Sequence, residues 1–484
     1  MSGLECVEIL FSNLKIDNEK YRFDSEFFLK IYLSAYNKLK KINHSIIGNE
    51  YDCLSDFHSN GSYKQIAENF TLLDKKNYAY MVRTVDLEQD DFTENVKYIS
   101  KHSYEYLSKS KIYGGELLIN KIGSPGRTYL MPNLNIPVSL GMNLFMLRMK
   151  KDSIFKESFL WIFFNTEIGK NIIKRKINGT VPMTIDKIAI KSLYIPIFSK
   201  NFYDKIDFIV NLIARIKNNY REVYKQAEKL LIDELNIKII DNNNVNTKFF
   251  NNSFGNSGRL DAEYYLPKYE DLQKNICKYP KKGNICSIIT LQDKNITPKD
   301  NRKYKYIELA NIDNIGNVID CTEDFGANLP TRARRIVHTG DVIISSIEGS
   351  LNKCAVITEE FDGAFCSTGF FVIKSGIFTA ETLLVLFKSE VLQNLMKKGC
   401  SGTILTAISK EEFEKICIPI LNDNIQQKIT CYIKQSKLLY NQSKLLLEVA
   451  KKSVEIAIEQ NEDSALKYLE EKSNEILNLN KEVI

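Results

Sequence analysis

The sequence has few of the residues that metal binding most often needs. Its 484 residues include only four histidines, namely His44, His58, His102 and His338, and none of them lies at ligand spacing from another. A histidine-based metal site is therefore not expected. The ten cysteines contain no Cys-x-x-Cys pair, which argues against a zinc ribbon and for reduced thiols in a cytosol.

Motifs of nucleotide and DNA chemistry are also missing. There is no Gly-x-x-x-x-Gly-Lys-Ser/Thr phosphate loop, because the Gly-rich segment 123–127 has the wrong spacing and no following lysine. No proline is followed by a second proline, which excludes the Asn/Asp/Ser-Pro-Pro-aromatic loop that holds the target amine in amino-methyltransferases. No proline is followed by aspartate, the usual opening of a restriction-nuclease core. These absences predict a binding protein whose chemistry is done elsewhere.

Long apolar runs are absent as well. None could span a bilayer, and the N-terminus lacks the basic stretch and apolar core of a secretory signal, so we expect a cytoplasmic protein without membrane contact. A hydrophobic content of 44% is enough to bury two or more cores. The net charge is +6, and residues 459–484 are acidic, so the rest of the chain is more basic than the total indicates. This charge permits nucleic-acid binding without requiring it.

What the chain does contain is an internal repeat. Residues 163–206 align without a gap to 386–429 at a constant offset of 223, and the identical pairs include Gly179/Gly402, Thr180/Thr403 and Lys187/Lys410. A duplicated module presents two similar surfaces, as expected of a chain that touches two places on one partner. The alternative is duplication for stability alone, since repeats also stabilise one another by stacking.

The repeat extends towards the front of each copy. Three further matches are Arg22-Phe23-Asp24-Ser25-Glu26-Phe27-Phe28 with Arg259-Leu260-Asp261-Ala262-Glu263-Tyr264-Tyr265, Gly115–Ile119 with Gly340–Ile344, and Ser139-Leu140-Gly141 with Ser367-Thr368-Gly369. The offset drifts from 237 to 223, so the copies differ by insertions and deletions in loops. A framework that two copies share, with loops that differ between them, is typical of proteins whose loops recognise different targets.

The pattern predicts an α+β fold. Two homologous globular modules with mixed sheets are joined by long helices that pair as an antiparallel coiled coil. Strands are expected at 117–119 and 143–149, and single helices at 155–176 and 379–398, with Gly179 as a left-handed C-cap. The predicted organisation is a first module at 1–198, a spacer helix at 199–237, an Asn-rich linker at 238–258, a second module at 259–421, a spacer helix at 422–460 and an acidic amphipathic tail at 461–484.

Both spacer helices carry a seam of small and large residues at 3-4 spacing. In an antiparallel pairing, large residues meet small ones, as close packing requires. The pairs expected are Ala227 with Tyr432, Val223 with Ser436, Ile216 with Ser443 and Ile206 with Ser453. The alternative is that each helix packs only on its own globular module.

Taken together, these residues resemble a known family. Two divergent modules, each closing with Gly-Thr, an Ile-Pro-Ile strand and a long helix, look like the DNA-specificity (S) subunit of Type I restriction–modification systems. The opening Arg259-Leu260-Asp261-Ala262-Glu263-Tyr264-Tyr265 is also reminiscent of that family, whereas the first opening, at 22–28, follows it only in outline. The likeness runs from about residue 21 to 460.

The resemblance implies that each module is a target recognition domain for one half of a bipartite, gapped DNA sequence. The helices would set the gap and dock methyltransferase (M) subunits, two of them expected, with restriction (R) subunits joining through the complex. The resemblance implies no catalytic site and no cofactor in this chain. S-adenosylmethionine, ATP and Mg²⁺ would be bound by the partner subunits, and the protein would serve in phage defence.

The candidate DNA-binding residues fall into two groups. Phosphate contacts need Lys and Arg, and base contacts need polar side chains where the copies differ. The phosphate candidates are Lys174, Arg175, Lys176, Thr180, Lys187, Lys397, Lys398, Thr403 and Lys410. The base candidates are Arg83, Lys121, Ser124, Arg127 and Asn143 in the first module and Arg302, Lys303, Arg332, Arg334, Arg335, Ser346, Asn352 and Lys353 in the second.

Other interpretations remain for these residues. The basic residues at the helix ends could instead complement a helix dipole, and the two threonines could cap the next turn. For the chain as a whole, the alternatives are a noncatalytic coiled-coil adaptor for proteins, or a nuclease or methyltransferase whose motif is not visible in the sequence.

Overall fold

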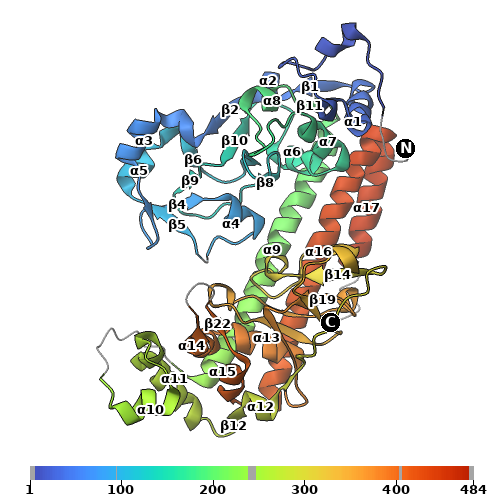
Figure 1. Ribbon diagram of the computed structural model, residues 1–484. Coiled ribbons are helices and arrows are strands. Elements are labelled where there is room, and N and C mark those ends of the chain that lie inside the picture. The colour runs from blue at the N-terminus through green and yellow to red at the C-terminus, as the bar shows by residue number, and fades with distance from the viewer. Residues whose placement is uncertain (1–5, 94, 238–246, 403–405, 479–484) are drawn as a thin grey trace. The chain divides into compact units, whose positions relative to one another are not determined.

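A computed structural model describes residues 6–93, 95–237, 247–402 and 406–478 of the chain, in two compact units. The first unit is Met1–Lys217 with Asn441–Ile484, and the second is Asn218–Tyr440. Each unit contains one copy of the repeat, and two long helices, α9 (Lys200–Leu235) and α16 (Asp423–Glu459), are each divided between the units (Figure 1). Within the described residues, no helix combines the length and apolar character needed to cross a membrane.

The strands of the first unit form two larger sheets and one small one. An antiparallel sheet has the order β2-β10-β7-β8, a second sheet has the order β3-β5-β4-β9-β6, and β1 pairs with β11. Their bounds are β1 His44–Ile46, β2 Tyr51–Asp56, β3 Leu72–Leu73, β4 Ala79–Val82, β5 Lys97–Ile99, β6 Lys111–Ile112, β7 Leu117–Asn120, β8 Thr128–Leu130, β9 Val138–Leu140, β10 Leu144–Met149 and β11 Tyr194–Pro196.

The helices of the first unit are mostly short. Beside α9 and the second half of α16 they are α1 Lys30–Lys40, α2 Ile47–Glu50, α3 Tyr63–Asn69, α4 Thr84–Glu88, α5 Lys101–Tyr106, α6 Glu157–Phe164, α7 Glu167–Arg175, α8 Lys187–Lys191 and α17 Glu462–Asn478.

The second unit repeats this arrangement. Its sheets have the orders β13-β20-β17-β18, β15-β14-β19-β16, β12-β23 and β21-β22. The strands are β12 Lys282–Asn284, β13 Thr290–Leu291, β14 Lys303–Ile307, β15 Thr322–Phe325, β16 Ala333–Ile336, β17 Val342–Ser345, β18 Cys354–Val356, β19 Phe365–Ser367, β20 Phe370–Lys374, β21 Cys400–Ser401, β22 Ala407–Ile408 and β23 Cys417–Pro419; the helices are α10 Phe254–Ser257, α11 Pro267–Lys278, α12 Ile285–Ile288, α13 Ala380–Lys388, α14 Glu390–Gly399 and α15 Lys410–Lys415.

The two units share one topology, which confirms the α+β fold expected from the repeat. The sheet β2-β10-β7-β8 corresponds strand for strand to β13-β20-β17-β18, and all pairs in both are antiparallel. The other large sheet has a single parallel pair in each unit, β4 with β9 and β14 with β19. The two Ile-Pro-Ile strands are β11 and β23, each paired antiparallel with one partner.

A buried layer explains why the central strands are apolar throughout. Every residue of β7 and of β17 is buried. In the second unit, Val342 and Ile344 pack with helices α13 and α14, whereas Ile343 between them packs with the other sheet. Because both faces of the strand are covered, its sequence is continuously hydrophobic instead of alternating.

The helices predicted at 155–176 and 379–398 are each two helices. Thr166 begins α7 and Ser389 begins α14, and each side chain accepts a hydrogen bond from the backbone N–H three residues on. Ser and Thr are favoured at such N-caps, where they satisfy an amide that the helix leaves free. Gly179 has φ 88°, but α7 already ends at Arg175, so Gly179 lies in the following loop and is not a C-cap.

The long helices pair in the second unit. Tyr220 of α9 lies beside Tyr440 of α16 with ring centroids 5.6 Å apart, and the Ser436 hydroxyl donates to the Tyr220 carbonyl at 2.9 Å. Further along α9, Leu230 faces the start of α16 around Lys428 and Tyr432, so the pairing is antiparallel as expected. Ser436 was expected opposite Val223, but it lies opposite Tyr220, which is about one turn away from Val223 along α9.

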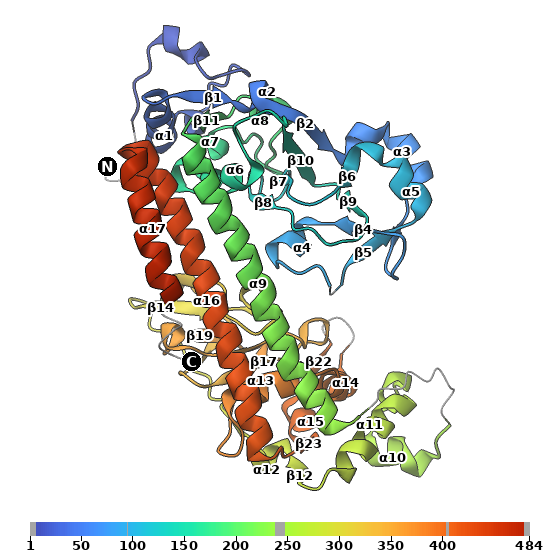
Figure 2. The same cartoon turned by 180° about the vertical axis from the view of Figure 1, so that it is seen from behind.

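A third helix completes the first unit. Figure 2 shows α17 alongside α16, and the two run antiparallel because the Ser453 hydroxyl donates to Ala465 O and the Gln442 amide donates to Ile476 O. Ser453, expected opposite Ile206 of α9, therefore directs its hydroxyl to α17. The apolar face of the tail, including Ala465 and Leu469, is buried, and residues 479–484 lie outside the described residues.

Candidate nucleic-acid interface

An arginine near the N-terminal end of each module connects that end to a helix near the C-terminal end of the same module. The Arg22 guanidinium forms an ion pair with Asp24 and donates to the carbonyls of Arg175 and Ile177 at 3.1 and 2.6 Å, just where α7 ends. Arg259 pairs with Asp261 and donates to Cys400 O at 2.7 Å, at the end of α14. A helix end leaves carbonyls without intrahelical partners, and a guanidinium satisfies them.

These ion pairs also shift the pKa values of the two carboxyl groups. The hydrogen bond from Arg22 lowers the pKa of Asp24, and the hydrogen bond from Arg259 lowers that of Asp261. The two openings, which match only in outline in the sequence, therefore make the same contacts.

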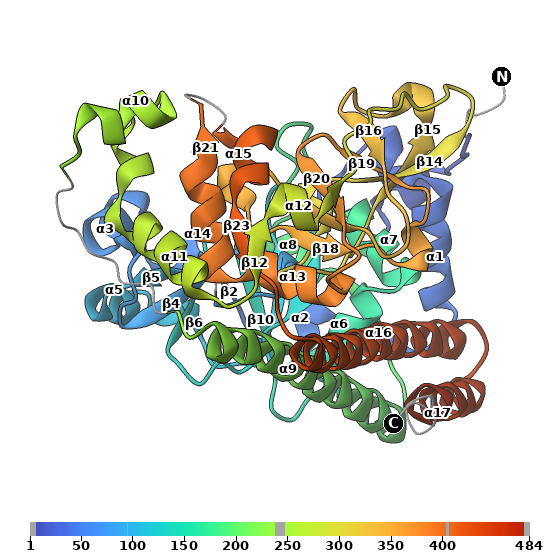
Figure 3. The same ribbon diagram turned by 90° about the horizontal axis from the view of Figure 1, so that it is seen from below.

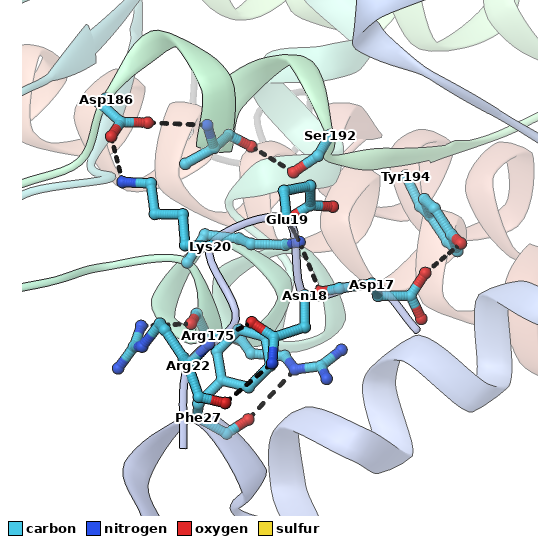
Figure 4. A network of polar contacts seen from close by, with 12 residues as sticks. Asp17, Asn18, Glu19, Lys20, Arg22, Phe27, Arg175, Asp186, Ser192 and Tyr194 are labelled. Carbon is cyan, nitrogen blue, oxygen red and sulfur yellow. Dashed lines mark hydrogen bonds and ion pairs between the residues drawn. The ribbon is translucent and has the colours of Figure 1, made fainter. Parts of the chain in front are cut away.

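The basic cluster at 174–176 is divided between the interior and the surface. The Lys176 ammonium lies 2.9 Å from Asp17 O and 2.6 Å from Glu19 Oε2. Arg175 Nε donates to Phe27 O at 3.1 Å (Figure 4). Arg175 and Lys176 are 3% and 4% exposed, and burial lowers the pKa of both. Both side chains therefore bond to partners within the module, and Lys174 is the exposed residue of the three.

The corresponding pair in the second module is partly exposed. The Lys397 ammonium lies 3.1 Å from Glu263 and 3.5 Å from Glu348. Lys398 donates to Gln273 Oε1 at 2.9 Å and lies 4.7 Å from the Tyr264 ring centroid, as Arg175 lies on Phe27 in the first module.

Lys187 and Lys410 make equivalent ion pairs. The Lys187 ammonium is 2.8 Å from Asp56 at the end of β2, and the Lys410 ammonium is 2.5 Å from Asp293, just after β13. Burial raises the pKa of Asp56, but hydrogen bonds from Lys187, Ser59 and Lys121 outweigh it and lower the pKa to about 2. The pair joins the sheet to the first turn of α8 in one module and α15 in the other.

Three loops of the first module meet through backbone hydrogen bonds, and we call residues 121–127, 141–143 and 178–184 the first loop cluster. The amide of Lys121 donates to Asn143 O at 2.8 Å, and the amide of Ile185 donates to Lys121 O at 3.2 Å. Asn178 and Thr184 exchange two hydrogen bonds of 2.8 Å each. Asn143 and Thr180 are exposed at this surface, and Ser124 is half-buried beside them.

The second module builds the same junction, formed by residues 346–353, 368–369 and 406–408, which we call the second loop cluster. The Ser346 amide donates to Gly369 O and the Ile408 amide donates to Ser346 O, both at 2.8 Å. Asn352 is half-buried on the β17–β18 hairpin, and the Lys353 ammonium donates to Ile312 O at 2.8 Å. Thr403 lies outside the described residues.

These hydrogen bonds correct one part of the sequence alignment. Ser346 corresponds to Lys121, and Gly369 therefore corresponds to Asn143 and not to Gly141. The match of 139–141 with 367–369 was wrong by two positions, since the strand pairing places Ser139 opposite Met81 in the way that it places Phe365 opposite Tyr306.

We call five cations of the second module the cationic strip: the exposed Lys294, Lys299, Arg302 and Arg332, and the half-buried Arg334. The loop that carries the first three is joined to β16 by a 2.7 Å hydrogen bond from Ile296 N to Arg334 O. In the part of the chain that the structure describes, none of the five forms an ion pair with a carboxylate. Arg302 and Lys303 extend over the rings of Tyr304 and Phe325.

The remaining candidates are engaged within their own modules. Arg83 pairs with the buried Asp86 at 2.6 Å, and Arg127, 63% exposed, lies 3.1 Å from Glu88. Lys121 pairs with Asp56 at 3.0 Å. Arg335 is half-buried, donates to Phe370 O, and has its pKa lowered by burial.

Sequence reasoning missed Lys294 and Lys299 of the strip, although both precede Arg302 in a polar segment interrupted by Pro298. It also missed Asp56 and Asp293, which occupy matching positions at the 237 offset of the front repeat. Among the described residues there is no group of three or more His, Cys, Asp or Glu side chains that could hold a metal ion.

Solved structures that match the chain include components of Type I restriction–modification systems, the family that the sequence resembles. One is the S subunit from M. genitalium, which is 15% identical, with a TM-score of 0.35, 89% of this chain covered and 96% of that one. Another is the HsdS subunit from Thermoanaerobacter tengcongensis, at 12% identity and a TM-score of 0.26, with 87% and 96% covered.

A third match is a structure from a study of type I restriction–modification complex assembly. It is 21% identical, with a TM-score of 0.29, 37% of this chain covered and 46% of that one. No protein-family model matches the sequence, and no curated protein matches it.

The Asp56 ion pairs give a testable stability prediction. Replacing Asp56 by Asn leaves the Lys187 and Lys121 ammoniums without their carboxylate, which should lower the free energy of unfolding by about 1–3 kcal/mol at neutral pH. Because the folded pKa is about 2 and the unfolded value is about 3.9, the stability from this charge is complete above about pH 4 and is lost as the pH falls towards 2.

Urea unfolding at several pH values measures this difference. Asp52→Asn is the matched control, since Asp52 is exposed on the same strand, and it should change stability by less than about 0.5 kcal/mol. An equal effect of the two substitutions, or no convergence at low pH, would contradict the assignment.

Proposed function

We propose that this chain is a DNA-specificity subunit of a Type I restriction–modification complex, in which each module recognises one half of a bipartite, gapped target. The observation that carries the proposal is the pair of loop clusters. The same backbone hydrogen bonds place Lys121 and Asn143 in one module and Ser346 and Gly369 in the other. One framework with different side chains is what two different half-sites require.

The chemistry of the clusters suits base recognition. Amide and hydroxyl groups such as those of Asn143 and Ser124 can hydrogen-bond to base edges in the major groove. The cationic strip of the second module suits phosphates, because four of its five cations are exposed and, among the described residues, none of the five pairs with a carboxylate. Buried Arg175 and Lys176 are assigned no contact with DNA in this proposal.

The long helices are proposed to set the gap between the half-sites and to dock methyltransferase subunits, two in number. Restriction subunits would join through that complex. The chain itself is proposed to be noncatalytic, with S-adenosylmethionine, ATP and Mg²⁺ used by the partner subunits. The support within the sequence is the absence of a phosphate loop and of a Pro-Pro amine-binding loop.

The experiment that tests this function replaces the polar side chains of one cluster. The triple substitution Ser124→Ala, Asn143→Ala and Thr180→Ala should abolish sequence preference at one half-site and leave the other unchanged. Each lost base contact should cost about 1–3 kcal/mol of discrimination. The measurement is enrichment from a pool of randomised duplexes, with the methyltransferase subunit present if one is encoded alongside.

A contrasting variant separates base contacts from phosphate contacts. Replacing Arg302, Arg332 and Arg334 by Ala should weaken binding to all sequences alike and flatten the dependence of log K on log salt by about 2.7 for three phosphate contacts. If the first triple leaves the enriched sequences and affinities unchanged, base recognition by the first loop cluster is wrong.

The spacing role of the helices is tested by changing their length. One helical turn is about 5.4 Å, and base pairs are about 3.4 Å apart. Adding or removing four residues in both α9 and α16 should therefore change the preferred gap by one or two base pairs and keep both half-site sequences. The gap is measured on duplexes with a series of spacers; an unchanged preference in both variants would contradict this role.

A further inference from the structure

Two thiols and an ammonium meet at one corner of the second module. Cys277 lies at the end of α11, Cys417 begins β23, and Lys282 begins β12, the partner strand of β23. Helix α11 packs on β23 beside α14 (Figure 3). The Cys277 and Cys417 side chains interact with each other, and the Lys282 ammonium donates to Cys277 O. Neither cysteine is in a disulfide.

The first module shows independently that these three positions face one another. The repeat matches Cys277 with Lys40, Lys282 with His44, and Cys417 with Tyr194. There, the Lys40 ammonium lies 6.0 Å from the Tyr194 ring centroid, and the His44 ring stacks on Tyr194 at 4.7 Å. The contact is thus part of the shared framework, and only the second module fills it with thiols.

We propose that Cys277 and Cys417 form a reversible disulfide when the protein meets a thiol oxidant such as a peroxide or a low-molecular-weight disulfide. The inference is independent of the proposed DNA specificity. It makes this corner an oxidation site that joins α11 to β23, the strand from which the chain continues into α16.

The geometry gives each thiol a different part in the reaction. Cys277 is exposed and meets the oxidant first, whereas Cys417 is half-buried and burial raises its pKa, so it remains a thiol. The thiolate is the reactive form of a cysteine, and exposure gives a dissolved oxidant access to Cys277. The thiols of Cys354 and Cys366 are buried, with pKa values raised to about 12, and are out of reach of a dissolved oxidant.

The reaction balances with hydrogen peroxide as the oxidant. The Cys277 thiolate attacks one peroxide oxygen, the O–O bond breaks, and a sulfenic acid forms with release of water once the departing hydroxide takes a proton. The Cys417 sulfur then attacks the sulfenic sulfur, the S–O bond breaks, and the second water leaves with the thiol proton. Two thiols are oxidised to one disulfide, and one peroxide is reduced to two waters.

The test uses the full folded chain titrated with hydrogen peroxide, alkylated, digested and analysed by mass spectrometry. The expected main product is a peptide pair linked through Cys277 and Cys417, which dithiothreitol returns to two alkylated thiols. Oxidation that yields no such pair, or yields it only after the chain is unfolded in urea, would overturn the proposal.

Two variants sharpen the assignment. Cys286→Ser removes another exposed thiol of the second unit, on α12, and should leave the linked pair unchanged. Cys417→Ser should leave Cys277 to accumulate as a mixed disulfide when oxidised glutathione replaces the peroxide. If Cys277 pairs with Cys286 instead, or if the Cys417→Ser chain shows no mixed disulfide at Cys277, the proposed pair and the order of attack are wrong.

Discussion

Two guanidinium groups connect the front of each module to its back. Arg22 donates to the carbonyls at the end of α7, about 150 residues later in the chain, and Arg259 does the same at the end of α14. Hydrogen bonds to a charged donor are strong, and the carbonyls they satisfy would otherwise be left without partners. In the first module, Arg22 holds the carbonyl of Ile177, directly before residues 178–184 of the first loop cluster, so this closure supports the cluster.

With the framework fixed in this way, the two modules can diverge where their loops meet. The amide of Lys121 and that of Ser346 make the same backbone contact, yet one side chain carries a charge and the other a small hydroxyl. The side chains of the loop clusters can therefore change without repacking the central strands β7 and β17, which are buried throughout. The same holds at the corner with Cys277 and Cys417, where the two modules share the backbone positions but differ in the side chains.

The sequence predicted elements well where the spacing of apolar residues indicates which face of a helix is buried. The spacer helices, expected at 199–237 and 422–460, run from 200 to 235 and from 423 to 459, because their 3-4 spacing marks a packed face. The sequence was less informative where a single side chain determines where a helix begins. Thr166 and Ser389 begin new helices inside apolar runs, and hydrophobic spacing alone did not reveal these N-caps. Contacts between distant residues, such as Lys176 with Glu19, have no local signal, so a buried ion pair was predicted as a surface phosphate contact.

The measurement that tests the central claim most directly is selection of randomised duplex DNA by the intact chain at moderate salt, with its methyltransferase subunit if one is encoded alongside. Two different loop clusters on one repeated framework predict enrichment of two short, different motifs separated by a constant gap. Binding without any enriched motif, or no binding at all, would contradict the account and favour an adaptor that contacts proteins only.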